Sequence, residues 1–118
     1  MGKRYCLALD LKEDPALIAE YREYHKNVWP EILGSIKDAG IRDMEIHLVE
    51  NRLFMIMEVD DGFSFEDKAE RDLANNKVQE WEALMWKYQK PLPMSRPGTK
   101  WRLMERIFKL DGSLTGVL

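Results

Sequence analysis

The chain has 118 residues, 45% of them hydrophobic and 33% charged, which predicts one folded domain rather than a disordered chain. The formal net charge is −3 and the basic residues are scattered, so the composition argues against a nucleic-acid partner. No apolar run approaches the roughly 20 residues of a membrane-spanning helix, and the N-terminal residues are too polar for a signal peptide. The single cysteine, Cys6, allows neither an internal disulfide nor a thiolate metal site, so we expect a cytoplasmic protein.

The first elements follow from apolar spacing and from two prolines. Residues 4–11 alternate between apolar and other side chains and predict a strand with one strongly apolar face. Asp14 and Pro15 begin a predicted helix, because Asp is a good N-cap and Pro fits the first helical position. Pro30 disfavours helical geometry at the residue before it, so we expect this helix to end or kink within residues 25–29.

A second helical segment and a hairpin come next. The segment begins at Pro30, and Gly40 is placed to end it. Residues 41–49 and 53–59 are predicted strands, joined by a tight connection at residues 50–52. The second of these strands is apolar on both faces, so we expect it to be central and covered on both sides.

Two more helices are predicted in the second half of the chain. Ser64, followed three residues later by Asp67, is a capping pattern, and the helix that it starts should break at Asn75-Asn76. Asn76 is expected to cap the next helix. The apolar face of that helix carries Val78, Trp81, Met85 and Tyr88.

The C-terminal part begins with a predicted stiff loop at residues 91–98, which contain three prolines. Alternation returns at residues 101–108 and predicts a last strand. We expect one domain over residues 1–110 and a loosely ordered tail at residues 111–118.

The predicted order of elements is strand, helix, strand, strand, helix, strand. A four-stranded antiparallel sheet with helices on one face accounts for this order and places the chain in the α+β class. Because both strand faces are partly apolar, the face without helices needs a partner. A homodimer that packs sheet against sheet is the simplest one.

The end of the first helix is the best candidate for chemistry. Tyr21, His25 and Trp29 are spaced four residues apart and share one inward face. A histidine at a helix C-terminus is favoured in its charged form, so we expect His25 to exchange a proton near neutral pH. Tyrosine and tryptophan can stack on a ligand and hydrogen-bond to it. The alternative interpretation is an amphipathic helix whose histidine is an ordinary core residue.

A second aromatic group, Trp81, Trp86 and Tyr88, lies on the last helix, which we expect on the same face of the sheet. Two aromatic helices beside one sheet suggest a cleft lined by rings. Because no cluster of Arg or Lys accompanies the rings, the cleft suits a neutral sugar rather than a phosphorylated ligand. The sequence has no metal-binding motif, nucleophile elbow, phosphate loop or dinucleotide fingerprint, and Cys6 is better explained as a structural residue than as a nucleophile.

The motif at the end of the first helix resembles the signature of the L-rhamnose mutarotases. The motif reads Glu20-Tyr21-x-x-x-His25-x-x-x-Trp29-Pro30-Glu31. The resemblance runs from Arg4 to about Leu110. It implies a ferredoxin-like dimeric α/β barrel, no cofactor, and interconversion of the α and β anomers of a 6-deoxy-L-hexose. It also implies that His25 is the proton donor and that Tyr21 and Trp86 bind the sugar.

Three positions depart from the pattern of the family. Met44 and Met85 replace a tyrosine and a tryptophan, and His47 stands where a tyrosine is usual. Flexible thioethers therefore replace two rings that contact the sugar. The proton donor is retained while the wall of the pocket differs, so L-rhamnose and L-fucose are both candidate substrates.

Mutarotation breaks the bond between the anomeric carbon and the ring oxygen, which requires an acid at the ring oxygen and a base at the anomeric hydroxyl. We expect His25 to protonate the ring oxygen and Tyr21 to orient it or a sugar hydroxyl. Trp86, together with Trp29, is expected to cover an apolar face of the sugar. The base is left open among Glu31, Glu58, His47, a tyrosine and water.

Two other functions are compatible with these residues. One is a cofactor-free monooxygenase of the same architecture that acts on an aromatic substrate. The other is a sugar-binding module that would bind its ligand without accelerating anomer exchange.

Overall fold

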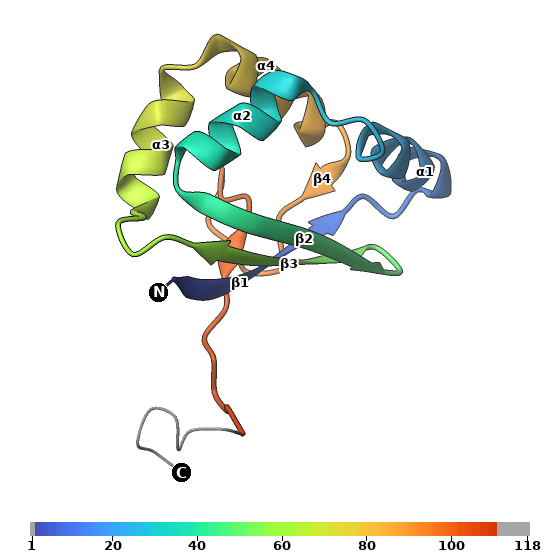
Figure 1. The fold of residues 1–118 in the computed structure, drawn as a ribbon. Coiled ribbons are helices and arrows are strands. Elements are labelled where there is room, and N and C mark those ends of the chain that lie inside the picture. The colour runs from blue at the N-terminus through green and yellow to red at the C-terminus, as the bar shows by residue number, and fades with distance from the viewer. Residues whose placement is uncertain (1, 111–118) are drawn as a thin grey trace.

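The computed structural model describes residues 2–110, and Figure 1 shows the elements along the chain. The predicted tail at residues 111–118 lies outside the described residues. None of the described helices has the length and apolar character needed to cross a membrane. The elements are β1 (Lys3–Leu11), α1 (Pro15–Tyr24), α2 (Pro30–Asp38), β2 (Ile41–Val49), β3 (Arg52–Val59), α3 (Phe65–Leu73), α4 (Asn76–Trp86), β4 (Gln89–Lys90) and β5 (Arg102–Leu103).

The strands form one antiparallel sheet in the order β2-β3-β1-β4, with β5 paired to β1 as well. This is the strand order of a ferredoxin-like α+β fold, so the predicted class is confirmed. Helices α2, α3 and α4 lie on one side of the sheet, and α1 lies near one end of it (Figure 1). β3 is central, between β1 and β2, as predicted.

The ends of α1 follow the residues that predicted them. The Asp14 carboxylate accepts hydrogen bonds from the backbone N–H groups of Ala16, at 2.9 Å, and Leu17, at 3.4 Å. The helix ends with His25 as its C-cap. Trp29 has an extended ψ of 136° because it precedes Pro30, which then starts α2.

The cap of α4 corrects one prediction. Asn75, not Asn76, is the N-cap, and its side-chain oxygen accepts from the backbone N–H groups of Lys77, at 3.0 Å, and Val78, at 3.2 Å. An N-cap residue needs extended backbone angles, and Asn75 has them with φ −107° and ψ 107°. Asn76 is already the first helical residue.

The hairpin between β2 and β3 is tighter than predicted, because β3 begins at Arg52 rather than Leu53. Glu50 turns the chain with a φ of +53°. Arg52 then binds the Asp10 carboxylate of β1 with two hydrogen bonds, Nε to Oδ1 at 2.7 Å and Nη2 to Oδ2 at 3.1 Å. This bidentate pair fixes the register of the two central strands.

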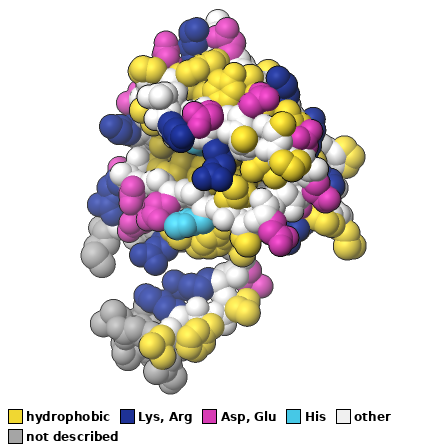
Figure 2. Space-filling view, turned by 90° about the vertical axis from the view of Figure 1, so that its right-hand side faces the viewer, with side chains coloured by type: hydrophobic (Ala, Val, Ile, Leu, Met, Phe, Trp, Pro, Cys, Tyr) yellow, Lys and Arg dark blue, Asp and Glu magenta, His cyan; other side chains and the backbone are white. Residues whose placement is uncertain are grey.

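The last predicted strand, residues 101–108, is mostly wrong. Only Arg102 and Leu103 pair with β1, and the backbone N–H of Met104 makes one more bond, 2.8 Å to the Cys6 carbonyl. Residues 105–110 have no neighbouring strand in the described chain and are exposed. Their alternating pattern therefore forms no strand, because no neighbouring strand is present to pair with it. Figure 2 shows that this segment stands away from the body of the molecule and carries hydrophobic side chains.

The core lies between the sheet and the helices, in two clusters of buried side chains. Trp101 packs against both clusters, although it belongs to no helix or strand. Its position means that the chain leaves the sheet after β4 and returns to the core before β5. The first cluster contains Leu11, Tyr21, Ile32, Leu53, Val78, Trp81, Met85 and Tyr88. The second contains Leu7, Ile41, Met55, Met57 and Val59.

Candidate active site

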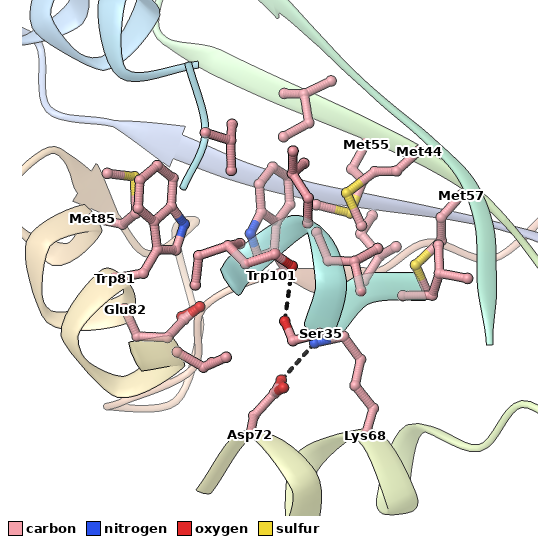
Figure 3. A pocket seen from close by; sticks show the side chains of 18 of the residues that line it. Ser35, Met44, Met55, Met57, Lys68, Asp72, Trp81, Glu82, Met85 and Trp101 are labelled. Carbon is pink, nitrogen blue, oxygen red and sulfur yellow. Dashed lines mark hydrogen bonds and ion pairs between the residues drawn. The ribbon is translucent and has the colours of Figure 1, made fainter. Parts of the chain in front are cut away.

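A cavity of about 700 Å³ lies between the helices and the sheet, within the usual size range of small-molecule sites. Figure 3 shows methionines of the strands on one side of it and Trp81 of α4 on the other. Tyr21, His25 and Gln89 also line the cavity, so two of the three ring residues of the helix-end motif belong to it. The methionines of the strand side are Met44, Met55 and Met57.

His25 is held by the end of its own helix. Its Nδ1 lies 2.8 Å from the Tyr21 carbonyl oxygen, and because a carbonyl only accepts, Nδ1 must carry the proton. The imidazole also packs between two rings, 4.3 Å from the centre of Tyr21 and 5.8 Å from that of Trp81. Among the described residues Nε2 has no hydrogen-bond partner, so this atom is the one that can exchange a proton with a ligand.

The charge of His25 differs from the prediction. Burial among the rings lowers the pKa of the His25 imidazole below 6.5, and the hydrogen bond to the Tyr21 carbonyl only partly opposes this effect. The prediction from the helix C-terminus was a favoured charged form. It was wrong in direction because desolvation outweighs the helix end and its carbonyl at this half-buried position.

Tyr21 lies deeper in the cavity wall, with 4% of its surface exposed. Burial raises the pKa of the Tyr21 hydroxyl to about 12; the hydrogen bond from Gln89 opposes this rise and the negative charge of Glu82 adds to it. Gln89 Nε2 donates to this hydroxyl at 3.3 Å, and the other amide atom of Gln89 is buried without a partner in the structure. Tyr21 therefore keeps its proton at neutral pH and remains a hydrogen-bond donor.

The predicted tryptophans occupy different places. Neither Trp29 nor Trp86 lines the cavity. Trp29 packs edge-on against Trp81, with ring centres 5.1 Å apart, and so supports it from behind. Trp86 is half-buried beneath the Lys100 ammonium, which lies 4.9 Å from its ring centre. The ring that reaches both the cavity and His25 is that of Trp81.

Of the candidate bases from the sequence, Glu31, His47 and Glu58 do not line the cavity, and the tyrosine that does line it, Tyr21, keeps its proton at neutral pH. His47 lies on the sheet face opposite the helices, where its Nε2 is 3.0 Å from Glu45 Oε1. Glu31 is exposed, and Glu58 shares the outward face of β3. The carboxylates that do line the cavity are Asp43, Asp72 and Glu82. Among residues 2–110, no three His, Cys, Asp or Glu side chains gather in a way that could hold a metal ion.

Sequence reasoning missed Glu82 and Gln89, and it counted Trp81 among the rings of the cleft without giving it a role at the sugar. The signal for Trp81 and Glu82 was present, because Trp81 and Met85 are one turn apart on the inward face of α4 and Glu82 follows directly. Gln89 gave no signal, because it lies in a strand of two residues that no periodicity can reveal.

Comparison with known proteins agrees with this geometry. A family model described as L-rhamnose mutarotase matches residues 4–110. The chain is 45% identical to an L-fucose mutarotase of Xanthomonas campestris over 96% of this chain and 92% of that protein. It is 35% identical to an L-rhamnose mutarotase of Sinorhizobium fredii over 66% of this chain and 73% of that protein.

A solved structure gives the same answer for the fold. The L-rhamnose mutarotase FA22100 of Formosa agariphila superposes with a TM-score of 0.68 at 22% identity, over 92% of this chain and 99% of that one. The sequence matches place this protein among the carbohydrate isomerases that interconvert anomers. It belongs to the L-rhamnose mutarotase family.

The lowered pKa of His25 can be measured directly, because the chain has only two histidines. In a His47→Gln variant, the single remaining imidazole Cε1–H signal belongs to His25. We expect this signal to titrate with a midpoint below 6.5 in an NMR pH series, since burial disfavours the charged ring. A midpoint at or above 6.5 would contradict the buried position. The same series on a His25→Gln variant identifies the other signal.

Proposed function

We propose that this protein interconverts the anomers of L-fucose in the cavity, with His25 as the proton donor. The observation that supports the proposal most directly is the orientation of His25. Its Nδ1–H is engaged by the Tyr21 carbonyl, so a second proton can only be carried and released at Nε2.

In this mechanism the imidazolium Nε2–H protonates the ring oxygen of the sugar while a base removes the proton of the anomeric hydroxyl. The bond between the anomeric carbon and the ring oxygen breaks, the open-chain aldehyde rotates, and closure returns the proton to His25. General acid catalysis of this kind contributes about 10²–10⁴-fold. Burial makes the imidazolium a stronger acid than a free histidine, which favours transfer to a weakly basic ether oxygen.

The sugar is held by one polar group and one ring. We assign Tyr21 as a hydrogen-bond donor to a sugar hydroxyl, because its phenol stays protonated. We assign Trp81 to cover an apolar face of the sugar, the role that the resemblance gave to Trp86. Trp29 supports the indole of Trp81 and takes part indirectly. Trp86 lies outside the cavity lining, with Lys100 over its ring, and is given no role at the sugar.

L-fucose is favoured over L-rhamnose by two observations. The L-fucose mutarotase of Xanthomonas campestris matches nearly the whole chain, whereas the L-rhamnose mutarotase of Sinorhizobium fredii matches about two thirds of it. Met44 and Met85 also line the cavity, so two of the three positions at which this chain departs from the rhamnose pattern lie in the wall of the site. The two sugars differ in the configuration of their hydroxyls, and a changed wall discriminates between such isomers.

Anomer exchange by magnetisation-transfer NMR tests the proposal. Wild-type protein should accelerate exchange of L-fucose above its spontaneous rate, and more than it accelerates that of L-rhamnose. His25→Ala should reduce the catalysed part by about 100-fold or more, because the proton donor is lost. Equal rates for wild type and His25→Ala would contradict the donor role, and a preference for L-rhamnose would contradict the assigned sugar.

The two tryptophans of α4 provide a matched pair. We expect Trp81→Leu to raise the KM for L-fucose by about 3- to 10-fold, because it removes the ring that covers the sugar. Trp86→Leu should change KM less, since Trp86 lies outside the cavity lining. Circular dichroism would first establish that both variants are folded. A larger effect of Trp86→Leu would return the covering role to that residue.

We also propose that the protein is a homodimer. The sheet face opposite the helices presents apolar side chains that no described element covers fully, among them Ala8, Phe54 and Ile56. The segment after β5 stands away from the body and exposes Ile107 by 89% and Phe108 by 71% (Figures 1 and 2). Exposed apolar area of this kind is typical of a surface that a second subunit covers.

Sedimentation velocity tests this assembly. The wild-type chain should sediment at about twice its mass of 13.9 kDa. A double variant, Ile107→Asp with Phe108→Asp, should sediment as a monomer, because charges oppose burial of the segment. Leu73→Asp is the control, since Leu73 is 75% exposed on α3 and lies outside the proposed interface. A monomeric wild type, or a double variant that remains dimeric, would contradict the proposal.

A further inference from the structure

We propose that Glu82 is the general base that removes the proton of the anomeric hydroxyl. The inference rests on the proposed function, because it assigns the second half of the same proton transfer. Glu82 lies on α4 and was not suggested by the sequence. The helix-end motif supplies a proton donor but no base.

Glu82 lies in the same cavity as the proton donor. It follows Trp81 directly on α4, and both side chains line the cavity with His25. Figure 3 shows its carboxylate turned toward the middle of the cavity, below Trp81. The negative charge of Glu82 also adds to the raised pKa of the Tyr21 hydroxyl.

One oxygen of this carboxylate is fixed and the other is available. Lys100 Nζ donates to Glu82 Oε2 at 2.6 Å and to the Glu82 carbonyl at 3.4 Å. The Lys100 side chain is only 14% exposed, so this ion pair is held by its surroundings. The structure gives Oε1 no bond to another described residue. Glu82 is therefore oriented by Lys100 and retains a free oxygen that can accept a proton.

The other two carboxylates of the cavity are less suited to this role. Asp72 is bound by Lys68, at 2.5 Å on its own helix α3, whereas Glu82 lies directly beside Trp81 on α4. Asp43 is exposed, and its Oδ1 accepts the backbone N–H of Met44 at 3.0 Å. Glu82 is the one of the three that shares the side of the cavity formed by the aromatic rings.

Glu82 and His25 together account for both proton transfers of the reaction. Glu82 Oε1 takes the proton of the anomeric hydroxyl, and the electron pair of that O–H bond forms the carbonyl of the aldehyde. The bond between the anomeric carbon and the ring oxygen breaks, and its electron pair moves to the ring oxygen. The ring oxygen receives the proton of His25 Nε2. Closure on the other face of the aldehyde reverses both transfers, so the protein ends in its starting protonation state.

The test compares Glu82→Gln, Glu82→Ala and a matched control in the L-fucose exchange assay. Glu80→Gln is the control, because Glu80 is exposed on the same helix and pairs with Lys77 at 3.3 Å, outside the cavity. We expect Glu82→Gln to lower kcat by about 100-fold or more with KM changed less than about threefold. Formate should restore at least about tenfold of the lost rate in Glu82→Ala by supplying a carboxylate.

Three results would overturn the assignment: exchange by Glu82→Gln within threefold of wild type, a loss confined to KM, or a loss in Glu82→Ala that formate does not restore. These results are distinct from failure of the proposed function. If wild type accelerates exchange and His25→Ala does not, while Glu82→Gln remains active, only the role of Glu82 is lost. If wild type does not accelerate exchange at all, both proposals are wrong.

Discussion

The hydrogen bond between His25 Nδ1 and the Tyr21 carbonyl is the interaction on which the site depends. It forms because α1 ends at Tyr24 with His25 as its C-cap, so the ring can turn back to a carbonyl of the last turn. This one bond gives a carbonyl at the end of α1 a partner, and it selects the tautomer of His25 that carries its proton on Nδ1.

The rest of the cavity is assembled from segments that are distant in the sequence. α4 supplies Trp81 and Glu82, β4 supplies Gln89, and the segment before β5 supplies Trp101 together with Lys100, which binds Glu82. Packing brings these pieces together, because the same face of the sheet carries the core and the site. Stability and function therefore share residues here. Trp81 is both a core side chain and the ring beside His25.

Local chemistry predicted most of the fold, and failed where a partner in space decides the outcome. Pro30 and Ser64 act within a few residues of themselves, so the elements that they begin were found. Residues 101–108 alternate as a strand does, but only residues 102–103 meet a neighbour to pair with. The charge of His25 was mispredicted for a similar reason, because desolvation by Trp81 and Tyr21 cannot be seen from the helix end alone. The motif located the proton donor, and only the cavity revealed Glu82.

β4 and β5 pair with the same edge of β1, and this arrangement affects how the site can change over evolution. The chain pairs with β1 at Lys90, departs, and pairs with the same strand again at Arg102. Both ends of the segment at residues 91–101 are thus anchored on one rigid strand, and this segment carries Trp101 to the cavity and Lys100 to Glu82. Substitutions or changes of length in it leave the register of the sheet intact. Ligand selectivity can therefore be altered in this segment while the helix that holds the proton donor stays unchanged.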